Sequence, residues 1–268
     1  MSAAAHADDP SGWHDRLMDA IARHGVRIVD RVVVLAETAS TQDAAREAAG
    51  GRPGLVVLAD RQSSGRGRLG RAWVQRGGLG LAMTVVPRVA EHAPDRVSLA
   101  AGLAAADAVA EFLPRAPIGV RWPNDVVERE RGRKLAGVLV ERAADLRFIG
   151  VGVNVHQVET DWPAELRGRA ASIHGLGGAA TRIEVAEALL AALDRALALP
   201  GDELVAAWSA RDVLRGTRAA FIHDGRTWTG TVEGIEPTSA IVLRLDDGST
   251  ARLPALTTSM DHGPAGPR

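Results

Sequence analysis

The sequence predicts an α+β protein, in which helices flank a mixed β-sheet and a small β barrel of about 50 residues follows at the C-terminus. Apolar strand-like runs alternate with helical patterns over residues 28–200, which favours a sheet covered by helices. Residues 95–114 are apolar on nearly every face, as is typical of a helix buried against a sheet. From about residue 213 the pattern changes to short strands, with a hairpin turn, "DDGS", at 246–249.

The same patterns divide the chain into four sections. Residues 1–27 form an N-terminal extension, in which we expect the first ten residues to be disordered and 11–25 to form a short helix. Residues 28–212 form the large domain, 213–260 form the small barrel, and 261–268 are a tail.

Within the large domain, the helices follow from their caps and the strands from β-branched runs. Helix 40–51 begins at Ser40 or Thr41 and ends at two glycines. Helix 181–200 begins with a capping box of Thr181 and Glu184. We expect strands or β-rich segments at 28–35, 55–60, 79–87, 118–128, 134–142 and 146–155.

Composition narrows the class of protein. At 268 residues, with 46% apolar and 24% charged residues, the chain is typical of a globular protein. Because the formal net charge is −1, any attraction for phosphates must come from a local cluster. The absence of cysteine excludes disulfides and thiolate metal sites, and the eight histidines form no spaced metal-binding set. No apolar run approaches about 18 residues, and the N-terminus is acidic where a signal peptide is basic, so we expect a cytoplasmic protein.

The segment "SSGRGRLGRAW" (63–73) matches the pattern G-x-G-x-x-G, but the residues after it are too rich in glycine to open the helix that a dinucleotide fingerprint requires. Between Asp60 and Arg76 lie five arginines and a single acid. Glycines expose backbone N–H groups and arginines bind phosphate in a bidentate manner, so the loop indicates an anion site. Because the free energy gained on binding nearly cancels the cost of ordering the backbone, we expect this loop to be mobile when empty and ordered by its ligand. A solvated basic surface loop is the alternative.

Lys134 is the only lysine, since every other residue of the 32 Lys and Arg is arginine. It opens the strand "KLAGVLVE" (134–141), in which Ala136 and Gly137 allow a ligand to lie against the backbone. A lysine ammonium is a compact charge that can bridge oxygens on two adjacent groups, as in a reaction that joins a carboxylate to a phosphate. We therefore expect Lys134 to hold two anions together. Chance retention of one lysine is the alternative.

Two further segments end strands with polar side chains. "VRWPND" (120–125) closes with an asparagine and an aspartate, and "GVGVNV" (150–155) places Asn154 at its end. Ordinary strand-and-turn structure is the alternative for both. The hydroxyls of Ser40 and Thr41 lack an obvious histidine partner, which disfavours a catalytic triad.

Four motifs in this order resemble those of biotin protein ligases of the monofunctional type, without a DNA-binding domain: "STQ" (40–42), "QSSGRGRLGRAW" (62–73), "RWPND" (121–125) and "KLAGVLVE" (134–141). "GVGVNV" follows at the family's spacing, and the resemblance covers roughly residues 30–255. It implies a class II synthetase-like catalytic domain, which lipoate ligases share, and an SH3-like C-terminal barrel. It also implies activation of biotin with MgATP to biotinyl-5′-AMP, and transfer of biotin to a lysine of the biotin carboxyl carrier domain of an acyl-CoA or pyruvate carboxylase.

The resemblance assigns roles to residues position by position. The catalytic residues it implies are Lys134, Arg66 and Arg68. Biotin would contact Ser40, Thr41, Gln42, Gln62, Arg66, Gly67, Arg68, Lys134, Gly137 and Gly152. The nucleotide would contact Arg68, Arg71, Trp73, Asn124, Asp125 and Asn154. Magnesium would be bound through the phosphates, near Asp125, with its protein ligands unassigned.

The sequence departs from the family pattern at several positions. Gln42 stands where members usually carry asparagine, Arg121 where they usually carry lysine, and Leu69 where several carry a basic residue. The segment "ARLPALTTSM" departs from the glycine-containing close that is usual for the small barrel.

Alternative functions remain open. Only about 27 residues precede the first strand, too few for the winged helix of the DNA-binding members, and the net charge is near zero, so we expect no operator binding. Because no long apolar run is present, we also expect no membrane partner. Lipoate ligase is the rival from the same chemistry, but its arginine- and glycine-rich segment is followed by a histidine, where this sequence has Trp73. A non-enzymatic anion- or RNA-binding module is disfavoured by the near-neutral charge. A degenerate ligase that only stores biotinyl-AMP is the third alternative.

Overall fold

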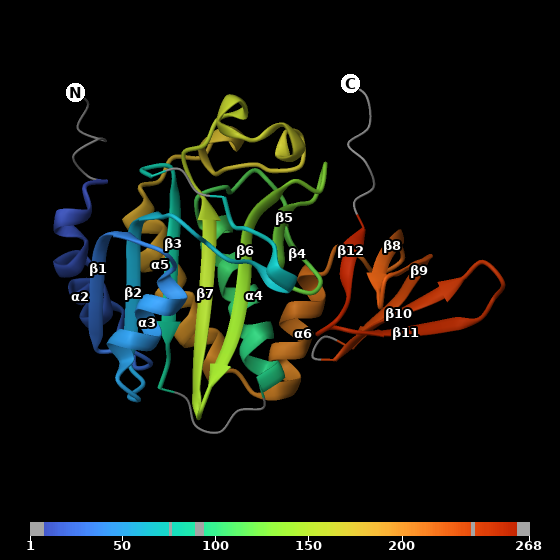
Figure 1. The fold of residues 1–268 in the computed structure, drawn as a ribbon, viewed down its shortest axis with the longest axis horizontal. Coiled ribbons are helices and arrows are strands. Elements are labelled where there is room, and N and C mark those ends of the chain that lie inside the picture. Colours follow the sequence, from blue (N-terminus) through green and yellow to red (C-terminus); the bar gives the residue numbers. More distant parts are fainter. Residues whose placement is uncertain (1–7, 75–76, 89–93, 237–238, 262–268) are drawn as a thin grey trace.

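The secondary structure forms two separate sheets. A computed structural model describes residues 8–74, 77–88, 94–236 and 239–261. The larger sheet has seven strands and the smaller has five. Figure 1 shows the larger sheet with helices on both faces and the smaller sheet beside it. This arrangement confirms the predicted fold class.

The larger sheet has the strand order β1-β2-β3-β7-β6-β5-β4. β1 runs parallel to β2, and every other neighbouring pair is antiparallel. Its strands are β1 (Arg31–Thr38), β2 (Leu55–Gln62), β3 (Gly80–Val86), β4 (Ile118–Arg121), β5 (Asp125–Glu128), β6 (Lys134–Ala143) and β7 (Leu146–Asn154).

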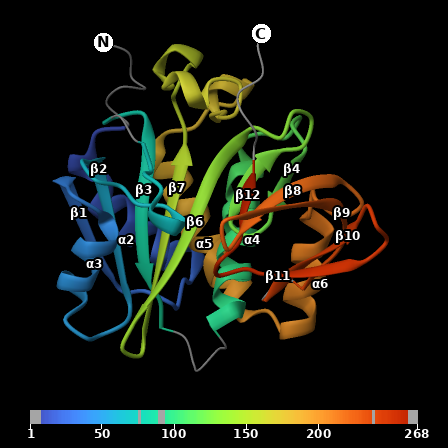
Figure 2. The same ribbon diagram turned by 45° about the vertical axis from the view of Figure 1, so that its right-hand side comes forward.

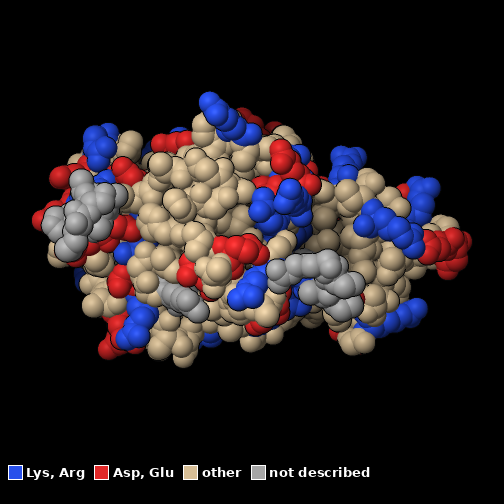
Figure 3. Space-filling view, turned by 90° about the horizontal axis from the view of Figure 1, so that it is seen from above, with Lys and Arg blue, Asp and Glu red and all other residues tan. Residues whose placement is uncertain are grey.

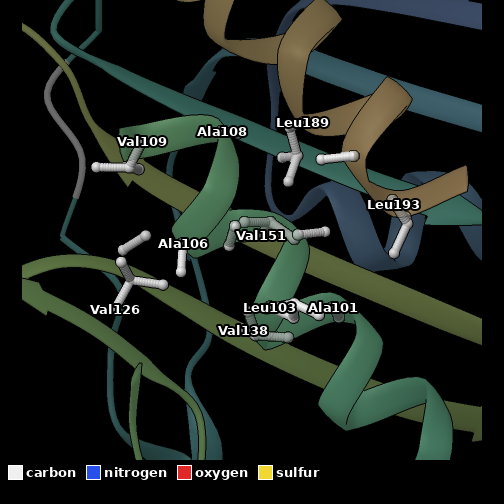
Figure 4. Packing of buried hydrophobic residues seen from close by; sticks show 14 of the residues in the cluster. Ala101, Leu103, Ala106, Ala108, Val109, Val126, Val138, Val151, Leu189 and Leu193 are labelled. Carbon is white, nitrogen blue, oxygen red and sulfur yellow. The ribbon is translucent and has the colours of Figure 1, made fainter. Parts of the chain in front are cut away.

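One face of this sheet is covered by α4 (Pro94–Glu111) and α5 (Arg182–Ala198). α2 (Trp13–His24) packs beside α5, and α6 (Gly201–Arg211) packs beside α4. Figure 4 shows α4 and α5 side chains such as Leu103 and Leu189 among the valines of the sheet, and these residues belong to one buried cluster. The main core therefore lies between this helical layer and the sheet.

The opposite face carries α3 (Thr41–Ala49), which packs on β2, β3 and β7. Ala45 and Ala49 of this helix are buried against Leu55, Val57 and Phe148 in a second, smaller cluster. Ser40 caps α3, because its side chain accepts a hydrogen bond from the backbone N–H of Gln42. The second cluster fixes α3 on the face where the candidate site lies.

The smaller sheet is antiparallel and has the order β11-β10-β9-β8-β12. Its strands are β8 (Arg218–His223), β9 (Arg226–Glu236), β10 (Ala240–Leu245), β11 (Thr250–Pro254) and β12 (Ser259–Asp261). The predicted "DDGS" turn joins β10 to β11. Trp122 meets Phe221 edge-on, with ring centroids 6.2 Å apart, so a buried aromatic contact joins the two sheets. Figure 2 brings the smaller sheet forward beside β4.

Several local predictions need correction. The helix α6 is missing from the sequence prediction, which has no element between residues 200 and 213, whereas Pro200 is the N-cap of a new helix. The segment 118–128 is a hairpin of two strands. The prediction of disorder over residues 1–10 is wrong for residues 8–10, because Asp8 accepts a hydrogen bond from the side chain of Arg182. Residues 1–7 lie outside the described ranges.

Short 3-10 helices complete the described secondary structure. They span Pro10–Gly12, Arg68–Gly70, Glu159–Asp161, Ala164–Leu166 and His174–Leu176.

In the parts of the chain that the structure describes, no helix combines the length and the apolar character needed to span a bilayer.

Candidate functional site

A cavity of about 480 Å³ lies on the α3 side of the larger sheet. Residues 63–74 cross the face of this sheet after β2, as Figures 1 and 2 show, and form part of the cavity wall. Its volume is in the range of pockets that bind small molecules. The structure brings every site residue that the sequence predicts to this one cavity: Ser40, Thr41, Gln42, Gln62, Arg66, Gly67, Arg68, Arg71, Trp73, Asn124, Asp125, Lys134, Gly137, Gly152 and Asn154.

The floor of the cavity is made by glycines on two paired strands. Side chains alternate across a strand, so Val151 and Val153 of β7 point into the main core while Gly150 and Gly152 face the cavity. Gly137 of β6 lies directly opposite Gly152 in the antiparallel pair. The "GVGV" pattern therefore builds a buried face and a flat, side-chain-free face on one strand.

The indole of Trp73 lies against this glycine floor. A methyl group at Gly152 would overlap the ring, and one at Gly137 would lie 3.3 Å from it. The residue is held by its backbone, because its N–H donates to the carbonyl of Gly65 at 2.8 Å. The sequence assigned Trp73 to the adenine and the two glycines to the biotin slot, but the structure places the indole directly on those glycines.

Polar groups close one end of the cavity around α3. The backbone N–H and the hydroxyl of Thr41 both donate to Oε1 of Gln62, at 2.8 and 3.1 Å. Nε2 of Gln42 donates to the carbonyl of Leu139 at 2.9 Å. Oε1 of Gln42 is buried and has no hydrogen-bond partner within the described part of the chain. A buried acceptor without a donor is costly, so Gln42 carries an unsatisfied acceptor beside this end of the cavity.

Lys134 lies in the middle of the cavity wall, in an ion pair with Asp125. Its Nζ is 2.5 Å from Oδ1 of Asp125 and 5.6 Å from the centre of the Trp73 ring. The other carboxylate oxygen of Asp125 accepts a hydrogen bond from Arg121 at 2.9 Å. Burial raises the pKa of Asp125, but the charges of Lys134 and Arg121 outweigh it and hold that pKa below its ordinary value. Two cations, Lys134 and Arg121, thus share the single carboxylate of Asp125, and the three groups together carry a net positive charge in the cavity wall.

The arginines of the 63–74 segment have different partners. Arg66 makes a bidentate pair with Asp43 in the first turn of α3, with N–O distances of 2.5 and 2.7 Å. Arg68 donates to the carbonyl of Ala255 and lies 3.5 Å from Oδ1 of Asn124. Burial lowers the pKa of Arg68, which means that its charge is poorly solvated. Both arginines line the cavity, and Arg68 is the less exposed of the two.

These pairs correct one inference from the sequence. When only the local sequence is considered, the excess of arginines in this segment indicates an anion site. In the structure, Asp43 pairs with Arg66, and Glu37 of β1 pairs with Arg61. Acids that are distant in sequence supply the missing charge, and no local pattern could have identified them. Arg76 lies outside the described residues.

The two predicted asparagines support the backbone. Nδ2 of Asn154 donates to the carbonyls of Lys134 and Ala171, at 3.1 and 3.0 Å. Nδ2 of Asn124 donates to the carbonyl of Val138 at 2.8 Å. Asn154 therefore fixes the start of β6, and with it the position of Lys134, rather than presenting its amide nitrogen to a ligand.

A buried acid that the sequence analysis missed shapes the turn before Lys134. Glu128 is 2% exposed and accepts hydrogen bonds from the backbone N–H groups of Glu130, Arg131 and Arg133. It also accepts one from Nε of Arg133, at 2.9 Å. Burial raises the pKa of Glu128, but these hydrogen bonds outweigh it and the net shift is downward. In the sequence, the only indication of this role is that Glu128 directly follows two buried valines in "VVE".

The described side chains around the cavity do not form a metal-binding site by themselves. Among the described residues, no group of three or more acids, histidines or cysteines is placed to hold a metal ion. Both carboxylate oxygens of Asp125 are occupied by Lys134 and Arg121. A magnesium ion at this site would therefore have to arrive on the phosphates of a nucleotide.

Comparisons with known proteins place the chain among the biotin and lipoate ligases. The model of the biotin/lipoate A/B protein ligase family matches residues 35–155. The biotin–[acetyl-CoA-carboxylase] ligase of Mycobacterium tuberculosis is 37% identical over 243 residues, which is 87% of this chain and 84% of that protein. The bifunctional ligase/repressor BirA of Bacillus subtilis is 33% identical over 148 residues, which is 52% of this chain and 45% of that protein.

Solved structures show the same fold. The biotin protein ligase of Aquifex aeolicus in complex with biotin and ATP is 26% identical, with a TM-score of 0.74. The match covers 87% of this chain and all of that one.

Proposed function

The chain belongs to the biotin protein ligases of the biotin/lipoate A/B protein ligase family, and on that premise we propose how its cavity works. The chain is a biotin protein ligase, and its substrates are biotin and ATP, the latter as MgATP. The observation that carries the proposal is the position of Lys134, whose Nζ lies beside Gly137 of the glycine floor and pairs with Asp125, in a cavity wall that Arg68 also lines.

The two ends of the cavity suit the two ends of a biotinyl-adenylate. The unpaired Oε1 of Gln42 would accept a ureido N–H. The ring system would lie on the flat floor of Gly137 and Gly152 once the Trp73 indole, which covers that floor, moves away. The desolvated guanidinium of Arg68 would bind the phosphate. The ammonium of Lys134 would then lie where the carboxylate and the phosphate meet.

The reaction follows from these positions in two steps. In the first, a biotin carboxylate oxygen attacks the α-phosphorus of MgATP, and pyrophosphate leaves. Lys134 and Arg68 reduce the repulsion between the two anions and stabilise the negative charge that develops between them. In the second step, an acceptor lysine attacks the carbonyl carbon, an amide forms, and AMP leaves. The cavity wall contributes positioning and charge to both steps.

We propose that the acceptor is the lysine of a biotin carboxyl carrier domain of an acyl-CoA or pyruvate carboxylase. We do not expect duplex DNA to be a partner. The net charge of the chain is −1, and on the face seen in Figure 3 basic and acidic side chains are interspersed. Salt-sensitive, sequence-specific binding to duplex DNA would contradict this expectation.

A pyrophosphate-release assay tests the function. The purified chain is supplied with MgATP and either biotin or lipoate, with and without a carrier domain. We expect pyrophosphate release with biotin and biotinylation of the carrier domain. Release with lipoate alone would favour the related lipoate ligases, and release with biotin without transfer to any carrier would favour a protein that stores biotinyl-AMP.

A further inference from the structure

Lys134 is both the residue next to the proposed reaction and the only lysine of the chain. If the site forms an acyl-adenylate, it forms a compound that reacts with amines. The Lys134 side chain lines the cavity and is 31% exposed, so burial alone does not shield its Nζ. The site must therefore keep its own amine from consuming its own intermediate.

The geometry supplies a means of doing so. Asp125 holds Nζ of Lys134 at 2.5 Å, and an ammonium in such a pair has no lone pair with which to attack a carbonyl. Before Nζ could react, it would have to leave the carboxylate and lose a proton. The loss of one charge-assisted hydrogen bond shifts an equilibrium by roughly tenfold or more.

Asp125 is itself fixed in place. Its second oxygen accepts a hydrogen bond from one nitrogen of Arg121, whose other terminal nitrogen donates to the carbonyl of Gly132 at 2.8 Å. Arg68 is the further cation that acts on Asp125. The carboxylate therefore cannot swing away from Lys134 without abandoning these interactions.

We propose that Asp125 protects Lys134 from acylation by holding it as an ion-paired ammonium beside the acyl-adenylate. This inference rests on the proposed function, since it needs an acyl-adenylate in the cavity. Asp125 acts here through Lys134 and is a positioning residue.

Acylation of Lys134 would be a simple and damaging side reaction. The neutral amine would attack the carbonyl carbon, and a C–N amide bond would form. The bond between that carbon and the phosphate oxygen would break, AMP would leave with the electron pair, and the amine proton would pass to water. The product would carry an uncharged amide in place of the ammonium. Arg121 fits this account, because a guanidinium at this position adds positive charge without adding a second amine.

The test adds purified biotinyl-5′-AMP to the intact protein without any acceptor, and locates the biotinyl group by peptide mass spectrometry. Asp125→Asn is compared with the native chain and with Asp246→Asn, which removes an exposed carboxylate paired with Arg218 on the smaller sheet. We expect acylation of Lys134 to be about tenfold faster or more in Asp125→Asn and unchanged in Asp246→Asn. Equal rates at Lys134 in all three proteins, including no reaction in any of them, would overturn the proposal. The N-terminal amine shows in each sample that the reagent is active.

A second measurement does not depend on the stability of Asp125→Asn. The variant Arg115→Lys places one amine at an exposed position and leaves Asp125 in place. We expect the introduced lysine to be acylated roughly ten times faster than Lys134 in the same molecule. Equal reactivity of the two lysines would overturn the proposal.

The two ideas can fail separately. Adding the acyl-adenylate bypasses its synthesis, so these assays report on Lys134 even if a variant cannot activate biotin. If the native chain releases pyrophosphate with biotin but its Lys134 is as reactive as the reference amine, the proposed function is supported and this inference is wrong. A native chain without biotin-dependent pyrophosphate release loses the proposed function.

Discussion

The indole of Trp73 covers Gly152 so closely that a methyl group on that glycine would overlap the ring. The contact joins the segment that crosses the cavity to the floor of the cavity. It also explains why a strand in the middle of a sheet carries a glycine that has no turn to make, because any side chain there would occupy the space between ring and backbone.

The first prediction concerns this contact. In Gly152→Ala we expect the KM for biotin to rise about tenfold or more, since overpacking costs about 1–3 kcal/mol and displaces Trp73. Initial rates of pyrophosphate release against biotin concentration measure this. Gly234→Ala is the matched control, because a methyl group at Gly234, on the smaller sheet, meets open space. An unchanged KM in Gly152→Ala would show that biotin does not use this floor.

The second prediction concerns the anchor of the arginine-rich segment. Asp43→Asn removes the carboxylate that pairs with Arg66, a contact of partly exposed groups worth about 1 kcal/mol or less. We therefore expect amide exchange over residues 63–74 to rise by about two- to fivefold. Asp247→Asn, at the exposed turn of the smaller sheet, should leave that exchange unchanged.

The same pair predicts a pH dependence. The hydrogen bond from Arg66 holds the pKa of Asp43 below its ordinary value. A lowered pKa in the folded state means that the pair stabilises the segment above the ordinary aspartate pKa of about 3.9 and is lost as the pH falls through the lowered value. Exchange over 63–74 in the native chain should therefore approach that of Asp43→Asn only in acid. Equal exchange in the two proteins at neutral pH would contradict this. The sequence also predicts that biotin and MgATP order the segment 63–74, which would lower its amide exchange.

A third prediction concerns the turn that delivers Lys134. Glu128→Gln keeps the shape of the side chain but removes the charge that several N–H donors share, and we expect it to lower the free energy of unfolding by about 1–3 kcal/mol. Because the pKa of Glu128 is lowered in the folded protein, the difference between variant and native chain should shrink as the pH falls below about 4.3. Denaturant unfolding at several pH values measures it. The exposed neighbour Glu130→Gln is the control, and equal effects of the two variants would contradict the account.

The fourth prediction concerns the kind of cation at position 134. In Lys134→Arg we expect pyrophosphate release to fall by about 100- to 1,000-fold in kcat, because a planar guanidinium cannot take the place of a compact ammonium between two oxygens. Arg115→Lys makes the reverse exchange at an exposed position and should leave the rate unchanged. Turnover of Lys134→Arg within a few-fold of the native rate would show that any positive charge suffices.

The sequence predicted those features that depend on local pattern. Thr181 and Glu184 form the capping box that the spacing indicates, and the helix 95–114 is buried against the sheet. The alternation of glycine and valine in "GVGV" is also visible in the sequence, and it places the two residue types on opposite faces, because side chains alternate across a strand whatever the rest of the chain does.

The pairings between distant segments could not be predicted in this way. Nothing near Arg66 in the sequence indicates Asp43, and the ion pairs of Asp125 depend on the register of two hairpins. The placement of Trp73 on the floor likewise depends on how the segment 63–74 folds over the sheet. These long-range contacts determine the charge and shape of the site, whereas the sequence alone shows only which residue types are present.

The central claim is that the Lys134 ammonium lies where the acyl group meets the phosphate, and a crystal structure with bound biotinyl-5′-AMP tests it most directly. The measured quantity is the distance from Nζ of Lys134 to the carbonyl and phosphate oxygens of the anhydride. The account predicts that both lie within hydrogen-bonding range, about 2.7–3.2 Å, while Asp125 stays beside the same ammonium. An acyl-adenylate bound in the cavity with Lys134 beyond reach of both oxygens would contradict it.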